Sequence, residues 1–326
     1  MNKKTIIGLR AFKKEESDFF YGREKEVENL LQILQKDKLV TLIGSSGSGK
    51  SSLINAGLIP RLEKGFLAQA GNQWAICKFR PGISPIENLA YSLTSEGSLS
   101  IEGKANTEDF SQYLKTIKDF DSLGITEIYK KAQIFNKKNL LIIIDQLEDM
   151  FKYKRFFDSS ESYQDDLLLN LVARTIKMKD TAIYFVLSIQ SEYFSNLTQY
   201  TKLQEIISKS QYAIPNLKKA TINEIIKNHM SIEALIFSNE SIEFIHEELD
   251  DDSSLLPNMQ FLFKQLIKKN QLNKNQKENI IGIQNIKDIG GLKNCIQYVF
   301  EDTYRSLSEI DQKAFEKINK ALYHFE

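Results

Sequence analysis

The sequence has few of the residues that form disulfides and metal sites. Its 326 residues include two cysteines, Cys77 and Cys295, which are too few for a disulfide framework and fit a reducing cytosol. Its three histidines, His229, His246 and His324, lack metal-ligand spacing, so we expect ordinary surface or boundary residues rather than a metal site. The composition therefore excludes the class of disulfide-rich secreted domains.

Long apolar runs and an excess of charge of one sign are also missing. Apolar runs such as residues 140–144 are far too short to span a membrane. Near the N-terminus, Arg10, Lys13 and Lys14 interrupt the apolar part too early for a signal peptide. Lysine plus arginine and aspartate plus glutamate number 43 each, which argues against a generally basic nucleic-acid binder. We therefore expect a cytoplasmic protein, with no membrane and with nucleic acid an unlikely partner.

What the sequence does contain is a phosphate-binding pattern. Residues 44–51 read G-x-x-x-x-G-K-S, the P-loop motif, between an apolar run typical of a buried strand and the start of a helix. This arrangement aims several backbone N–H groups at one point, which favours an anion over a chance glycine-serine turn. We expect Lys50 to reach the β- and γ-phosphates and Ser51 to bind Mg²⁺. The predicted nucleotide-binding residues of the loop are Gly44, Ser45, Ser46, Gly47, Ser48, Gly49, Lys50, Ser51 and Ser52.

Strand-like runs alternate with amphipathic helical segments up to about residue 216. The run 139–145 has five consecutive apolar residues, 140–144, without alternation, as in a central parallel strand that is buried on both faces. Alternation of strands and helices predicts an α/β fold, a P-loop NTPase with a parallel five-stranded sheet and helices on both faces. The expected strands are residues 38–43, 73–80, 139–145, 181–188 and 211–214.

From about residue 217 the strand signal disappears. Thr221 and Glu224 have capping-box spacing, which predicts a helix opening there and running through Met230. We expect an all-helical lid and then the start of a winged-helix-like domain. The predicted domains are 1–216, a P-loop NTPase domain with an N-terminal lead-in; 217–285, a helical lid; and 286–326, a partial helical or winged-helix segment.

A P-loop requires a carboxylate for Mg²⁺ at the end of a buried strand. Asp145 has this place, directly after five consecutive apolar residues. It would bind the ion directly or through its hydration shell, because Mg²⁺ keeps several waters. Ser51 and Asp145 are therefore the predicted metal ligands; the alternative is that Asp145 caps a following helix.

Two further residues are candidates for catalysis. The strand at 74–79, between the P-loop helix and the Asp145 strand, is typical of P-loop ATPases that use a catalytic glutamate to orient or deprotonate water. Glu148 is the best candidate and Asp149 the second; alternatively, both cap the next helix. Gln190, at the end of the fourth strand, should face the γ-phosphate, where it could hydrogen-bond phosphate or water but brings no positive charge.

Together these residues resemble the STAND NTPases and, among them, the bacterial novel STAND group. The resemblance covers nearly the whole chain. The segments that carry it are residues 8–12, 19–24, 45–62, 79–82, 144–151, 255–257 and 290–292.

The resemblance implies an ATP-switched signalling module that holds ATP or ADP with Mg²⁺ between a sheet domain and a helical domain. Such proteins exchange ADP for ATP, oligomerise and bring effector domains together. Carried over to this chain, Arg23 lines the nucleotide pocket and Pro257 lies near the adenine. In the family an arginine usually occupies the position of Gln190; a missing cation there predicts slow hydrolysis. A role in prokaryotic defence or stress signalling follows by analogy only.

Three functions remain open from the sequence. The first is a STAND switch with slow ATP turnover, and the second is a nucleotide-binding scaffold with little hydrolysis. The third is a DNA-associated AAA-like ATPase, which the zero net charge disfavours. We expect sensor and effector domains, or partner proteins, outside this chain, which is either a fragment of a larger protein or a minimal form.

Overall fold

The computed structural model describes residues 6–95, 98–99, 107–132, 134–135, 137–153, 162–178, 180–233, 235–272 and 280–323. The chain divides into two compact units, Ala11–Asn216 and a second formed by Met1–Arg10 with Leu217–Glu326. We call them the NTPase unit and the C-terminal unit. His324 lies outside the described residues. In the described part of the chain, no helix combines the length and the apolar character needed to cross a membrane.

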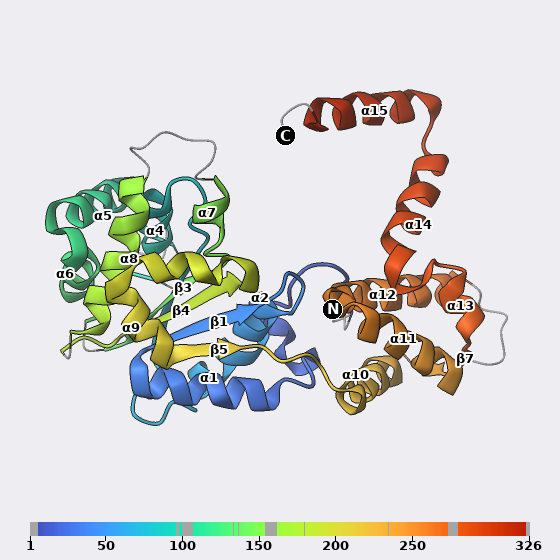
Figure 1. Ribbon diagram of the computed structural model, residues 1–326, viewed down its shortest axis with the longest axis horizontal. Helices are drawn as coiled ribbons and strands as arrows, with labels where there is room; N and C mark the ends of the chain where they lie inside the picture. Colours follow the sequence, from blue (N-terminus) through green and yellow to red (C-terminus); the bar gives the residue numbers. More distant parts are fainter. Residues whose placement is uncertain are drawn as a thin grey trace. The chain divides into compact units, whose positions relative to one another are not determined.

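The NTPase unit is built on a five-stranded sheet of order β2-β3-β4-β1-β5, in which every neighbouring pair is parallel (Figure 1). This confirms the predicted fold class. Because β4 lies between β1 and β3, the P-loop strand does not touch the strand that precedes Asp145. The strands are β1 (Leu39–Gly44), β2 (Trp74–Phe79), β3 (Asn139–Ile144), β4 (Ile183–Gln190) and β5 (Gln211–Ala213).

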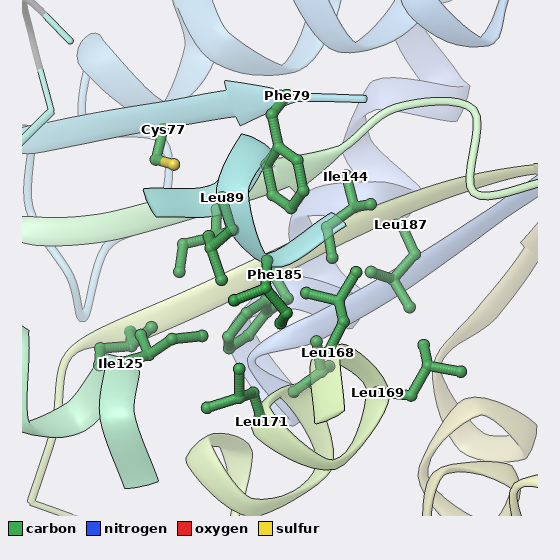
Figure 2. Close-up of a cluster of buried hydrophobic side chains, with 14 of the residues drawn as sticks. Cys77, Phe79, Leu89, Ile125, Ile144, Leu168, Leu169, Leu171, Phe185 and Leu187 are labelled. Carbon is green, nitrogen blue, oxygen red and sulfur yellow. The ribbon is translucent and has the colours of Figure 1, made fainter. Parts of the chain in front are cut away.

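Helices cover both faces of this sheet. Successive strand residues point to opposite sides, and in β3 both sets of side chains are apolar, so each face packs against helices. On one face, Leu141 and Ile143 of β3 pack with the apolar stripe of α1 and with the helical turns that follow the P-loop. On the other, Ile142 and Ile144 pack with Leu89, Leu168 and other side chains of the remaining helices (Figure 2). All four β3 side chains are buried, which confirms the prediction that strand 139–145 is covered on both faces.

Helical elements lie between the strands of the NTPase unit, in the alternation that the sequence predicts. The segment after the P-loop is continuous but changes from α to π and back to α. The elements are η1 (Lys14–Phe19), α1 (Glu24–Asp37), α2 (Lys50–Ser52), η2 (Leu53–Leu58), α3 (Ile59–Glu63), α4 (Pro85–Leu93), α5 (Thr107–Phe120), η3 (Asp121–Leu123), α6 (Gly124–Lys131), α7 (Asp149–Tyr153), α8 (Ser162–Ile176), η4 (Ser191–Gln199) and α9 (Thr201–Ser210).

The C-terminal unit is helical, with one addition that the sequence pattern did not predict. Ile236–Phe237 and Ile280–Ile281 form a two-residue parallel ladder, too short for a periodic signal. Its elements are α10 (Lys219–Ile232), β6 (Ile236–Phe237), α11 (Asn239–Asp251), η5 (Ser253–Leu255), α12 (Leu256–Leu272), β7 (Ile280–Ile281), α13 (Ile283–Lys287), α14 (Gly291–Ser306) and α15 (Glu309–Tyr323).

Two local predictions in this unit are wrong. Thr221 does not open a helix, because α10 already begins at Lys219, so Thr221 lies within its first turn. His229 and His246 are more buried than the predicted surface or boundary positions: they are 1% and 7% exposed. The ring of His229 contacts the Ile225 carbonyl, that of His246 contacts Asn223, and burial lowers the pKa of both imidazoles.

At the start of α14, a carboxylate caps the helix and a glycine makes room for it. The backbone N–H of Leu292 donates to Glu248 Oε2 at 2.6 Å, so a buried carboxylate from α11 caps this helix. Gly291 has φ +65°, and a Cβ at this position would lie 2.8 Å from the same oxygen. Glycine is therefore required both for the backbone conformation and for the close approach of the carboxylate.

Candidate nucleotide site

The P-loop connects the end of β1 to the start of α2. Gly44 ends the strand, and a Cβ at this position would lie 2.6 Å from Ser48 Oγ, so a larger residue would displace the Ser48 hydroxyl from its place in the loop. Gly49 has φ +91° and directly precedes α2, where the chain must change direction. The loop thus has the strand–turn–helix geometry that phosphate binding requires.

Lys50 and Ser48 point their polar atoms into this loop. Lys50 is 8% exposed, and its Nζ donates to the carbonyl oxygens of Gly44 and Ser45, each at 2.8 Å. Burial lowers the pKa of Lys50, and the nearby carboxylates of Glu148 and Asp145 oppose this shift. Ser48 Oγ is buried and has no hydrogen-bond partner among the described residues. An ammonium, a hydroxyl without a partner and backbone N–H groups are the donors that a phosphate needs.

Asp145 lies at the end of β3 and is 2% exposed. Its Oδ1 accepts hydrogen bonds from Ser188 Oγ at 2.6 Å and from Ser51 Oγ at 3.1 Å, and its Oδ2 lies 3.1 Å from Lys78 Nζ. Burial alone would raise the pKa of Asp145, but Lys78 and the hydroxyl donors outweigh it, and the pKa is lowered. The carboxylate is therefore ionised near neutral pH.

The structure thus brings Ser51 and Asp145 together across the sheet edge. A hydroxyl oxygen and an ionised carboxylate oxygen are ligands that suit Mg²⁺. Their chemistry fits this ion, while their role as metal ligands stays a prediction.

Sequence reasoning missed Lys78 and Ser188, which contact Asp145 in addition to the predicted Ser51. Each interrupts an otherwise apolar strand, and a polar residue near the end of a buried parallel strand was the available signal. Lys78 Nζ also donates to Asn55 Oδ1 at 2.6 Å, and Asn55 Nδ2 donates to the Phe12 carbonyl at 3.0 Å. The orientation of Asp145 is therefore tied to the helix after the P-loop and to the segment before α1.

Glu148 is held by the neighbouring strand. The turn after β3 passes through Gln146, at φ +61°, and is fixed by a hydrogen bond from Gln146 N–H to Ser188 Oγ at 3.0 Å. This turn buries Glu148, which is 1% exposed, and its Oε2 accepts the backbone N–H of Gln190 at 3.1 Å. Its side chain therefore bonds the end of β4 rather than capping α7. For Asp149, the second candidate, burial and the nearby Glu148 raise the pKa.

Gln190 ends β4 beside the P-loop, because it pairs with Gly44 in the parallel register. Its Oε1 accepts a hydrogen bond from Lys152 Nζ at 3.3 Å. Glu148, Gln190 and Lys152 thus form a connected group at the same edge of the sheet as the P-loop.

The other two predicted nucleotide residues lie elsewhere in the chain. Arg23, 6% exposed, bonds the Glu26 carboxylate at 3.1 Å and the Pro215 carbonyl at 2.8 Å. It also lines a cavity of about 300 Å³ between α1 and the segment that follows the P-loop, a size at the lower end for small-molecule pockets. Pro257 belongs to α12 in the C-terminal unit. Contact of either residue with nucleotide stays a prediction.

Comparison with protein families matches residues 7–326 to the family described as Novel STAND NTPase 1. The chain belongs to this family. The resemblance inferred from the motifs is thereby confirmed over nearly the full length of this STAND protein. A comparison with curated proteins found no match.

Similar solved structures are P-loop ATPases. They include the ORC2 protein of Aeropyrum pernix in its ADPNP-ADP complexes, with a TM-score of 0.55 and 15% identity over 81% of this chain and 66% of that one. A Walker-type ATPase of Pyrococcus abyssi has a TM-score of 0.52 and 16% identity over 96% and 79%. The A. pernix ORC1 protein in complex with DNA has a TM-score of 0.54 and 9% identity over 89% and 69%.

These likenesses show the fold alone, since all identities are low. The STAND chain spans just under two thirds of the ORC2 chain. Because one similar structure is of a protein bound to DNA, the comparisons give no support to our expectation that nucleic acid is not a partner.

Proposed function

We propose that this protein is a nucleotide-dependent switch that binds ATP or ADP with Mg²⁺ at the P-loop. The contact between Ser51 and Asp145, 94 residues apart in sequence, carries the proposal. It sets a hydroxyl and an ionised carboxylate beside the P-loop lysine. The hydroxyl and the carboxylate are oxygen ligands that suit Mg²⁺, and the lysine is a cation for the phosphates. Membership of the STAND family supports a role in switching, in which exchange of ADP for ATP or slow hydrolysis is coupled to homo-oligomerisation.

Each of these residues has a defined chemical role. Lys50 and the backbone N–H groups of the P-loop bind the β- and γ-phosphates. Ser51 and Asp145 would hold Mg²⁺, which would supply positive charge against the phosphate oxygens. Hydrolysis forms a bond from a water oxygen to the γ-phosphorus and breaks the bond to the β–γ bridging oxygen, whose electron pair leaves with ADP. Glu148, oriented by the Gln190 N–H, takes the proton of that water.

Isothermal titration calorimetry of the pure protein with ATP and ADP tests nucleotide binding. We expect binding of both, loss of binding in Lys50→Ala, and loss of the Mg²⁺ dependence in Asp145→Asn. Lys131→Ala is the control: this lysine packs over Phe120 and ends α6, a helix whose Tyr129 bonds the Lys138 carbonyl just before β3 begins, whereas Asp145 follows the end of β3. Wild-type protein that binds neither nucleotide would refute the proposal.

The signalling output is proposed from the family alone. We infer an assembly that grows in the ATP state, with sensor and effector functions in other domains or partners, in prokaryotic defence or stress signalling. The helical lid limits of 217–285 and the winged-helix start at 286–326 belong to the same inference. Light scattering with ADP and with a non-hydrolysable ATP analogue tests assembly, and a salt-dependent shift on duplex DNA would instead favour the DNA-associated alternative.

A further inference from the structure

The departure of Gln190 from the family pattern leaves a question about the charge at the γ-phosphate. Stabilising the transition state of phosphoryl transfer requires positive charge near the γ-phosphate oxygens. A glutamine is neutral and cannot supply it. The end of β4 is nevertheless the right place for such a charge, because Gln190 is paired in register with Gly44, the first residue of the P-loop.

We propose that Lys152 is a catalytic residue whose ammonium binds the γ-phosphate and supplies the positive charge that Gln190 lacks. This inference rests on the proposed function, ATP binding at the P-loop. Gln190 then acts as a positioning residue, because its side-chain oxygen holds the lysine.

The contacts of Lys152 fix its ammonium at the end of β4. Its Nζ donates to Gln190 Oε1 at 3.3 Å and lies 5.2 Å from the centre of the Tyr193 ring. Its backbone N–H bonds the Glu148 carbonyl at 3.0 Å, so the lysine is one helical turn beyond the candidate base. An amide oxygen and an aromatic ring therefore contact the ammonium, while the backbone turn fixes where the side chain begins.

These partners leave Lys152 with hydrogen-bonding capacity for an anion. A lysine ammonium has three donors, and the contact with Gln190 uses one of them. Among the described residues, no carboxylate oxygen forms a salt bridge with Lys152, whereas Lys78 in the same unit is paired with Asp145. The Asp149 carboxylate interacts with Lys152 electrostatically, but the two form no salt bridge, so the half-buried ammonium keeps donors for a phosphate.

The two lysines hold different places at this edge of the sheet. Lys50 belongs to the P-loop itself, where its Nζ bonds the carbonyl oxygens of Gly44 and Ser45. Lys152 is held beside the loop, through Gln190, which pairs in register with Gly44. ADP has no γ-phosphate, so Lys152 should discriminate between the two nucleotides while Lys50 serves both.

Calorimetry with ADP and with a non-hydrolysable ATP analogue, both in Mg²⁺, tests this on the full chain. Lys152→Met keeps the length of the side chain and removes the charge. We expect its affinity for the ATP analogue to fall about tenfold or more, since a charged hydrogen bond is lost, with ADP affinity changed less than about twofold. Lys152→Arg should restore most of the analogue's affinity, and Lys131→Met, which also removes a lysine from an aromatic face, should change neither.

The outcomes separate this inference from the proposed function. Equal losses for both nucleotides, or no loss for either, would overturn the role of Lys152 while ATP binding stands. Wild-type protein that binds neither nucleotide would overturn both. If Lys152→Met does not fold, Gln190→Leu removes the oxygen that holds the lysine, and a selective loss for the ATP analogue is again the expected result.

Discussion

The pairing of Lys78 with Asp145 gives the sharpest test of how this site is held together. Lys78→Met leaves a carboxylate that is 2% exposed without its cation and leaves Asn55 Oδ1 without its donor. Removing one partner of a fully buried ion pair costs about 3–5 kcal/mol, and an exposed pair is worth about 0–1 kcal/mol. The Lys78 side chain is 31% exposed, and two hydroxyl donors remain on Asp145. We therefore expect the free energy of unfolding to fall by about 2 kcal/mol.

Trp74 provides the assay, because it is the only tryptophan and lies in β2 of the NTPase unit, on the same strand as Lys78. Its fluorescence during urea unfolding reports this unit alone, which avoids treating a two-unit chain as one transition. Lys118→Met is the matched control. That lysine is 54% exposed and lies 3.6 Å from the Glu87 carboxylate, so its loss should change stability by less than about 0.5 kcal/mol.

The pH dependence of this effect has a definite sign. The folded-state pKa of Asp145 is lowered from its ordinary 3.8, so its ionised form contributes stability that is fully present above that value and is lost as the pH falls through the lowered pKa. The difference between wild type and Lys78→Met should therefore be full at pH 7 and should shrink below about pH 4, where the carboxyl becomes protonated. A loss no greater than that of Lys118→Met, or a difference that ignores pH, would refute the reasoning.

Two further predictions concern catalysis and the C-terminal unit. Glu148→Gln should slow single-turnover phosphate release by about 10²–10⁴-fold, the usual share of a general base, whereas equal rates would favour a scaffold that only binds nucleotide. Gly291→Ala should destabilise the C-terminal unit by about 3 kcal/mol, because alanine is strained at φ +65° and its Cβ displaces the Glu248 cap. The control is Gly282→Ala, because Gly282 has φ −86° and its added Cβ would have its nearest contact at 3.6 Å. Unfolding is followed by far-UV circular dichroism, and the unfolding transition reported by Trp74 fluorescence should not change. Equal effects of the two substitutions would contradict this account.

The parts of this fold that were predictable are those encoded locally. A buried parallel strand is a continuous apolar run, so residues 139–145 identified β3 and with it Asp145. The P-loop is a contiguous motif, and its strand and helix flank it directly. The start of α10 was predicted less well than the strands. The helix begins two residues before the predicted capping box, because an ordinary helix-forming pair, Lys219 and Ala220, extends its first turn.

The partners of these residues could not be predicted, because they depend on strand order. Ser188 meets Asp145 only because β4 lies next to β3, and Gln190 meets Gly44 only because β4 also lies next to β1. No local pattern encodes that order. The same holds for Glu248, which reaches the start of α14 across 44 residues of sequence. Local patterns therefore identify the groups that carry chemistry and miss those that orient them.

The residues that strand order brings together bear on how the site can act as a switch. ATP and ADP differ by one phosphoryl group, so a switch needs a residue that contacts only that group. Lys50, on the P-loop itself, would also contact the β-phosphate, which both nucleotides share. The group of Glu148, Gln190 and Lys152 lies at the end of β4, where the γ-phosphate alone would reach it. Because η4 follows Gln190 directly and carries Tyr193 against Lys152, the same contact would transmit the presence of the γ-phosphate to the next element of the chain.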